Sequence, residues 1–211
     1  MNVPKQVAAN GSHLRMDVLP SGAWSLPGSC CCNTLMHQNP YGEDPVRLVL
    51  DLAARPPRSP GEFAERCVAA GMVIDRPVGD EDLAEILEFI PRWLAVVDAD
   101  TPERRAALLN ELLTASSEHP RLTDHADGGW HIHYRADGLG LAGVVRAVVS
   151  VGTALHLTGR GMERLGRCAL TECGRAYGDF TRGGQQRYCS HACANRDAVR
   201  RFRARRAARN P

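Results

Sequence analysis

Lysine, secretory signals and long apolar runs are scarce or missing in this chain. Lys5 is the only lysine among the 26 Lys and Arg residues. No stretch has the pattern of a signal peptide, and the most apolar segment, residues 139–158, is interrupted by Arg146 and three glycines. These features predict a cytoplasmic protein without a membrane partner, in which residues 139–157 form a buried or interface helix.

Recognisable catalytic patterns are also missing. No Ser/His/Asp or Cys/His arrangement, phosphate-binding loop or convincing pair of carboxylates is visible. We therefore expect a protein that is not an enzyme, although catalytic groups can converge in space from distant parts of a chain. The chain contains 8 cysteines and no secretory signal, which indicates reduced thiols rather than disulfides.

Charge is divided unevenly along the sequence. Residues 160–211 contain 13 Arg against 4 acidic residues, which gives +9, and residues 1–159 contain 13 basic and 20 acidic residues, which gives −7. The sum is the net +2 of the whole chain. A basic C-terminal tail predicts an acidic partner. A GC-rich bacterial genome would also favour arginine over lysine, so the clustering of the arginines counts for more than their type.

Length and composition predict an α+β protein with three parts. The 211 residues suffice for one mid-sized domain and a small appendage. Residues 1–39 are predicted to be a poorly ordered segment or a cloning remnant, and poor order is favoured over metal binding for its Cys30–Cys32 run. Residues 40–158 are predicted to form a mainly helical domain with a small antiparallel sheet, and residues 159–211 a C-terminal finger that ends in a basic helix.

Helical periodicity and capping signals define the elements of the middle part. Ser59, followed by Pro60 and Glu62, has the pattern of a helix start, and Thr101-Pro102-Glu103 starts another helix. Asp80 is expected to cap a later helix that Pro91 kinks or divides. The expected helices cover residues 46–54, 60–70, 80–97, 102–118 and 139–157.

In one segment between these helices, the apolar residues recur at every second position. Trp130 and Ile132 alternate with His131 and His133, which is a strand pattern, and residues 127–129 are expected to form the preceding hairpin turn. The two histidines point to the same face of that strand. They could bind a metal or a ligand, but we favour exposed or hydrogen-bonded histidines.

Two close pairs of cysteines near the C-terminus have the spacing of a zinc site. Four residues separate Cys168 from Cys173, fifteen separate the two pairs, and three separate Cys189 from Cys193. Zinc prefers four such ligands in a tetrahedron. A short segment with few large apolar side chains cannot form a stable core alone, so it needs a metal ion or another cross-link to fold. We predict one structural Zn²⁺ held by these four residues, with no position left for water or substrate. The alternatives are buried or disulfide-bonded cysteines, and a site in which His191 replaces one of them.

The residues around the cysteines predict a zinc ribbon or treble-clef finger. Residues 176–180 and 185–188 have the pattern of two short strands joined by a turn. Ser190 is expected to cap a C-terminal helix that runs to about Ala208. Cys193 would then lie in the first turn of that helix, near the positive end of its dipole.

This C-terminal helix carries most of the basic residues of the finger. Arg196, Arg200 and Arg203 share one face because they are three to four residues apart, whereas Val199 and Phe202 are expected to pack on the hairpin. The predicted nucleic-acid contacts are Arg182, Arg187, Asn195, Arg196, Arg200, Arg201, Arg203, Arg205 and Arg206.

Other roles stay open for the same residues. Asn195 could bond a base edge, a phosphate or the backbone of the finger itself, and its position in the first helical turn slightly favours the last of these. The arginines could form a solvated tail or bind an acidic protein surface. Nucleic acid is favoured because a folded metal module would present the arginines together.

The motif residues of the finger carry a family resemblance. They are Cys168, Cys173-Gly174, Phe180 or the Asp179 before it, Arg182, the Arg187–Ser190 run and Cys193-Ala194-Asn195-Arg196. They resemble the CGNR zinc-finger family, whose members often carry an N-terminal ABATE domain, and residues 40–158 look like one. Two positions depart from the family pattern, since Ala194 stands in place of its glycine and Tyr188 in place of a usual tryptophan.

The resemblance implies a stress-induced transcription regulator or an RNA-binding zinc-ribbon-like protein. We predict a DNA-binding regulator that favours DNA over RNA. Its body would sense an effector or form a homodimer, with the helix at residues 139–157 as a candidate contact. The alternatives are an RNA-binding protein and a zinc-stabilised protein–protein interaction module.

Overall fold

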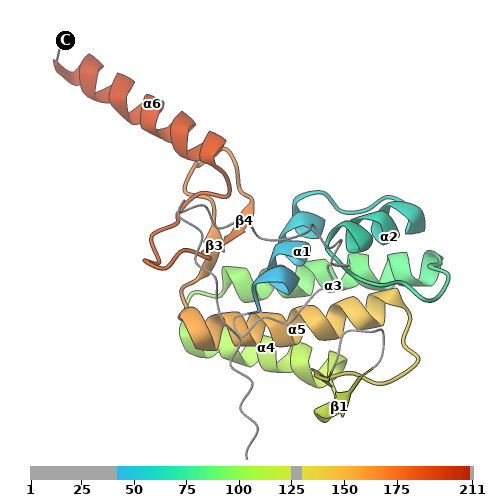
Figure 1. Cartoon of the computed structure of the whole chain (residues 1–211). Coiled ribbons are helices and arrows are strands. Elements are labelled where there is room, and N and C mark those ends of the chain that lie inside the picture. The colour runs from blue at the N-terminus through green and yellow to red at the C-terminus, as the bar shows by residue number, and fades with distance from the viewer. Residues whose placement is uncertain (1–41, 125–129, 210–211) are drawn as a thin grey trace, which may run out of the picture. The chain divides into compact units, whose positions relative to one another are not determined.

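The computed structural model describes residues 42–124 and 130–209, which all belong to one compact unit, Asn33–Pro211. The predictions for residues 1–39, including the Cys30–Cys32 run, and for the turn at residues 127–129 lie outside the described residues. Figure 1 shows the elements, which in chain order are α1 (Glu43–Ala54), α2 (Pro60–Ala69), α3 (Asp80–Asp98), α4 (Pro102–Ser116), β1 (Arg121–Thr123), β2 (His131–His133), α5 (Leu141–Arg160), β3 (Leu165–Arg167), β4 (Ala176–Gly178) and α6 (His191–Arg209).

The elements confirm the predicted α+β class. The described residues are mostly helical and contain two small two-stranded antiparallel sheets, β1–β2 and β3–β4. Hydroxyl caps start two helices as the sequence indicates. The Ser59 Oγ accepts from the Glu62 N–H at 3.2 Å and begins α2, and the Thr101 Oγ1 accepts from the Arg104 N–H at 3.1 Å and begins α4.

The start of α3 corrects one prediction. Gly79, not Asp80, is the N-cap residue, and the Asp82 carboxylate accepts from the Gly79 N–H at 3.1 Å. The same carboxylate accepts from the Ala142 N–H at 2.9 Å in the first turn of α5. One aspartate therefore satisfies backbone donors at the starts of two helices that are distant in sequence.

Pro91 does not divide α3, which runs unbroken from Asp80 to Asp98. A proline inside a helix removes one hydrogen bond and crowds the preceding turn. Here Ile90 and Trp93 are buried on either side of Pro91. Their packing in the core stabilises the helix and offsets the loss of that hydrogen bond.

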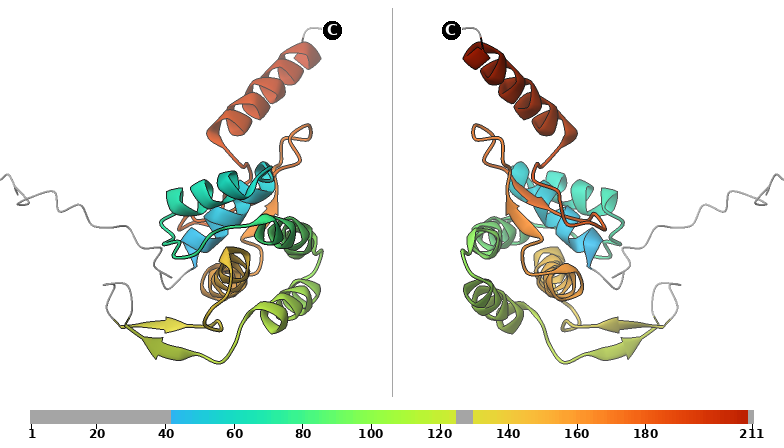
Figure 2. Two further views of the ribbon diagram at one scale, coloured as in Figure 1. Left: turned by 90° about the vertical axis from the view of Figure 1, so that its right-hand side faces the viewer. Right: turned by 90° about the vertical axis from the view of Figure 1, so that its left-hand side faces the viewer.

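Helix α5 is the central element of the core. It packs against α1, α3 and α4 (Figure 2). Its buried side chains include Val145, Val149 and Leu157. By length and composition α5 would also suit a membrane span, but 61% of its apolar window is buried inside the protein, as in the core helix of a soluble protein. This burial confirms a core helix and leaves α5 little surface for a dimer contact.

The small sheet β1–β2 confirms the predicted strand around residue 132. Leu122 pairs with Ile132, and Thr123 with His131, in antiparallel register. Leu122, Trp130 and Ile132 are exposed, which means that this sheet does not bury its apolar face in the core.

Candidate metal centre

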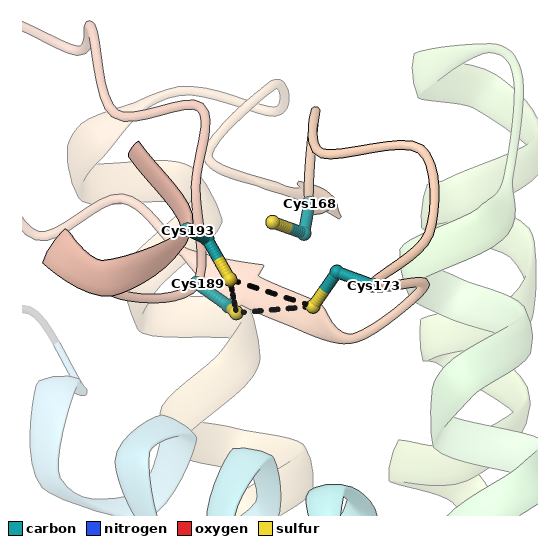
Figure 3. Close-up of side chains that lie close together, drawn as sticks. All are labelled: Cys168, Cys173, Cys189 and Cys193. Carbon is teal, nitrogen blue, oxygen red and sulfur yellow. Dashed lines mark hydrogen bonds between the residues drawn. The ribbon is translucent and has the colours of Figure 1, made fainter. Parts of the chain in front are cut away.

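The first two cysteines lie at the ends of a tight loop between β3 and β4. The strands pair in antiparallel register, with Leu165 opposite Gly178. The Cys168 N–H donates to the Arg175 carbonyl at 2.8 Å, and the Cys173 N–H donates to the Leu170 carbonyl at 2.8 Å. These bonds turn the chain back on itself and bring both sulfurs to one side of the loop (Figure 3).

The pairing of β4 corrects the predicted hairpin. Residues 185–188 do not form a strand, and β4 pairs instead with β3, which precedes the first cysteine. The buried Asp179 explains the difference. Its carboxylate accepts from the Thr181 N–H at 2.8 Å and from the Gln186 N–H at 2.9 Å, so the loop folds around this side chain instead of pairing as a ladder.

The second pair of cysteines lies at the start of α6. The Ser190 Oγ accepts from the Cys193 N–H at 3.3 Å, and the Ser190 carbonyl accepts from the Ala194 N–H at 3.1 Å. The predicted cap and the position of Cys193 in the first turn are therefore both confirmed. The Ala169 N–H donates to the Arg187 carbonyl at 2.8 Å, which fastens the loop of the first pair beside that of the second.

The four sulfurs converge on one point (Figure 3). The Cys173 and Cys189 sulfurs are 3.5 Å apart, those of Cys189 and Cys193 are 3.6 Å apart, and those of Cys193 and Cys173 are 3.7 Å apart. The Cys168 sulfur lies within 4.8 Å of the other three. A zinc tetrahedron with Zn–S bonds of about 2.3 Å has edges of about 3.8 Å. The four cysteines are thus placed to hold one zinc ion, and all four thiols are free of disulfides.

Local interactions shift the acidity of two of these thiols in opposite directions. The hydrogen bond with Ser190 lowers the pKa of Cys193 to about 7, and burial raises the pKa of Cys189 to about 12. Three of the sulfurs lie within hydrogen-bonding distance of one another, and a divalent cation at their centre favours the thiolate form of all four cysteines. With four protein ligands the site is structural, because no position remains for water or substrate.

The finger is joined to the helical body by packing and by charge. Leu165 is part of the core that the helices form, and Phe180 packs against that core. The Arg47 guanidinium lies 3.9 Å from the centre of the Phe180 ring. Arg167 forms a two-point ion pair with Asp98 at 2.6 and 2.7 Å, and its hydrogen bonds lower the pKa of the Asp98 carboxyl. The base of the finger is therefore held by α1 and α3.

Asp197 is a residue that sequence reasoning missed. It is buried and accepts from the Tyr188 hydroxyl at 2.7 Å and from Arg200 at 2.6 Å, and it forms an ion pair with Arg201 at 3.0 Å. The Tyr188 hydrogen bond, followed by the two arginines, lowers the pKa of the Asp197 carboxyl. The available signal was its spacing of three and four residues before two arginines on one helix. Arg200 also lies 3.5 Å from Glu172.

The predicted nucleic-acid contacts fall into three groups. The side chains of Asn195, Arg196, Val199, Arg200 and Arg203 line one shallow groove along α6. Arg206 continues that face, three residues beyond Arg203. Arg201 is turned toward Asp197 and Arg205 to the side opposite Arg203, while Arg182 and Arg187 are exposed on the loop before α6.

Two expectations for α6 are corrected by its exposure. Val199 and Phe202 do not pack on the finger, since 48% and 59% of their surfaces are exposed. Every side chain from Ala198 to Arg209 is exposed. Asn195 is exposed as well and makes no side-chain hydrogen bond within the part of the chain that the structure describes, so it is not bonded to the finger's own backbone.

Comparison with known proteins assigns the finger. Residues 164–206 match the CGNR zinc finger family. This range begins just before β3 and ends within α6, and it includes all four converging cysteines. No curated protein matches the chain.

Proposed function

We propose that this protein is a DNA-binding transcription regulator that grips nucleic acid through α6. The observation that carries the proposal is an exposed arginine face on a helix whose first turn is fastened by a metal-binding cysteine. Arg196, Arg203 and Arg206 lie on this face, and none of them forms an ion pair within the described residues 42–124 and 130–209. Their charges are therefore available to an external anion.

Polyanionic nucleic acid fits this surface better than a single acidic group does. Helix α6 contains seven arginines and one acidic residue, Asp197, which gives +6. At about 1.5 Å per residue the 19 residues extend over about 28 Å. A rigid row of charges of that length matches the repeated phosphates of a nucleic-acid backbone.

Duplex DNA is favoured over RNA because of the exposure of α6. A helix of about 10–12 Å diameter fits the major groove of B-DNA, which is about 12 Å wide. The major groove of A-form RNA is too narrow and deep to admit a helix. Since α6 is exposed all round beyond Asp197, it can enter a groove without first separating from the body. Asn195 and Arg196, at the start of the groove-lining face, have the side chains that commonly bond adenine and guanine.

The zinc ion, Asp197 and the helical body also have roles in the proposed function. The zinc ion orders the finger, and Asp197 holds the base of α6 against Tyr188. The body, residues 40–158, is proposed to be an ABATE-like domain that senses an effector or forms a homodimer. Because α5 is buried in the core, a homodimer would use another surface of the body.

A matched pair of arginine variants tests the proposal. Arg203 lies on the groove-lining face and Arg205 lies about 200° further round the helix. Fluorescence anisotropy with a labelled duplex should show that Arg203→Ala binds several-fold more weakly and that its salt slope falls by about 0.9, the loss of one phosphate contact. Arg205→Ala should retain both the affinity and the slope. Equal losses for the two variants would mean that α6 binds through diffuse charge and not through this face.

Competition separates the alternatives. Unlabelled duplex DNA, single-stranded RNA and structured RNA compete for the same protein, and duplex DNA should displace the probe at the lowest concentration. If RNA does so instead, the protein is an RNA-binding protein with the same α6 contacts. Pull-down partners that survive nuclease treatment, together with no measurable affinity for either polymer, would indicate a protein-interaction module.

A further inference from the structure

His131 and His133 on strand β2 bring two imidazole nitrogens together away from the cysteine site. The Nε2 atoms of the two rings lie 3.1 Å apart. The ring centroids are 4.9 Å apart and the ring planes meet at 65°, so the rings converge at their tips and do not stack. Residues two apart on a strand share a face, and here both side chains lean toward a single point.

This geometry fits the coordination of one metal ion. We propose that His131 and His133 form a second cation site, which binds an exchangeable divalent transition metal such as Zn²⁺. An ion placed about 2.0–2.1 Å from both nitrogens would subtend an N–metal–N angle of about 95–102°, between the octahedral and tetrahedral values. A site with two protein ligands leaves further positions to water or to a small molecule.

The neighbours of the pair are consistent with a cation there. Across the sheet His131 faces Thr123, and His133 faces Arg121. The Arg121 guanidinium is paired with the Asp137 carboxylate, with one contact at 2.6 Å, which offsets its charge. The hydrogen bond from Arg121 lowers the pKa of the Asp137 carboxyl. Residues 1–159 carry a net charge of −7, which favours cations over anions around the body.

The proposed site differs in chemistry from the cysteine site. Four thiolates hold a structural ion permanently, whereas two neutral imidazoles hold a metal that exchanges with the solution. In the structure this separation is that of a hydrogen bond between the two imidazoles, which agrees with the favoured sequence-based interpretation. A metal ion would displace the shared Nε2 proton, because it needs the lone pairs of both nitrogens. The two states are therefore distinguished by whether added metal reaches both nitrogens.

Zinc stoichiometry of the full chain tests the site. After equilibrium dialysis against low-micromolar free Zn²⁺, elemental analysis should find one zinc more per chain in the wild type than in His131→Gln/His133→Gln. His119→Gln is the matched control, because His119 is an exposed histidine just before β1, and it should keep the wild-type count. Equal zinc counts in the wild type and the double variant would overturn the proposal.

A measurement on the wild type guards against a misfolded variant. Long-range ¹H–¹⁵N correlation spectra report each imidazole nitrogen separately. During a Zn²⁺ titration of the zinc-loaded protein, the Nε2 resonances of His131 and His133 should shift together while those of His119 stay in place. Unchanged Nε2 resonances, or equal shifts for His119, would contradict the site whatever the variant does.

Discussion

The Trp93 indole is fixed by a single buried hydrogen bond. Its Nε1–H donates to the Thr153 Oγ1 at 2.9 Å, which joins α3 to α5, and both side chains are fully buried. Thr153→Val keeps the shape of the side chain but leaves the indole donor unsatisfied. We expect the free energy of unfolding of the zinc-loaded protein, measured in urea, to fall by about 1–3 kcal/mol.

The same substitution elsewhere on α5 provides the control. The Thr158 Oγ1 donates to the Ala154 carbonyl of its own helix at 2.8 Å and lies on the exposed side. Thr158→Val should change the free energy of unfolding by less than about 0.5 kcal/mol. If the two variants were equally stable, the buried hydrogen bond would contribute nothing measurable.

Individual residues were predictable from the sequence where the signal is local. Ser59, Thr101 and Ser190 all cap helices, because a hydroxyl before a helix bonds an N–H only three residues away. Asp82 was not identified, since its second partner is the Ala142 N–H, sixty residues along the chain. The role of Asp179 in its loop was not predicted, because the surrounding residues also fit a pattern of two short strands. Its carboxylate instead accepts from backbone N–H groups of the loop.

At the scale of elements, the junction between α3 and β3 depends on charge. The hydrogen bonds from Arg167 hold the pKa of Asp98 below its usual range. A carboxyl whose pKa is lowered by folding stabilises the protein only while it is ionised. Its contribution is fully present at neutral pH and is lost as the pH falls below about 4, through the lowered pKa.

Asp98→Asn tests this junction. Both side chains of the pair are partly exposed, so we expect the variant to lose only about 0.5 kcal/mol at pH 7 and low salt. The difference from the wild type should shrink at high salt, and in thermal melts it should shrink progressively as the pH falls below about 4. Asp100→Asn, at an exposed position two residues further on, is the control. A difference that persists unchanged in acid would show that geometry, not charge, is responsible.

Elements were predicted more reliably than their pairing. Helical periodicity located α1 to α5 because each buries a repeating apolar face. The pairing of β3 with β4 was not predictable, since each has only three residues and Leu165-Gly166-Arg167 contains no alternation. The four cysteines were predictable as a set because metal ligation fixes their spacing, whatever strands support them.

At the scale of the whole molecule, the division of charge directs how a polyanion can approach. Residues 1–159 carry −7 and residues 160–211 carry +9. Phosphates are repelled by the body and attracted by the finger, so approach through α6 is favoured. The sequence predicted this division. It did not predict that Arg200 and Arg201 pair with Asp197, nor that Phe180 of the finger packs against the helical core.

We expect zinc binding to couple the folding of the finger to its affinity for nucleic acid. Cys193 fastens the first turn of α6, and beyond Asp197 this helix has no buried side chain that would hold it otherwise. Without the metal, Cys168 and Cys173 lose their link through the ion to Cys193 in α6, and binding must then supply the cost of ordering the finger.

The most direct test is to measure duplex affinity as zinc is removed and returned. Chelation should release one zinc from the cysteine site, weaken binding by about tenfold or more, and be reversed by stoichiometric Zn²⁺. Cys173→Ser should reproduce the chelated state without a chelator. If the zinc-free protein binds duplex DNA with unchanged affinity and salt slope, the metal-anchored helix is not what grips the polymer.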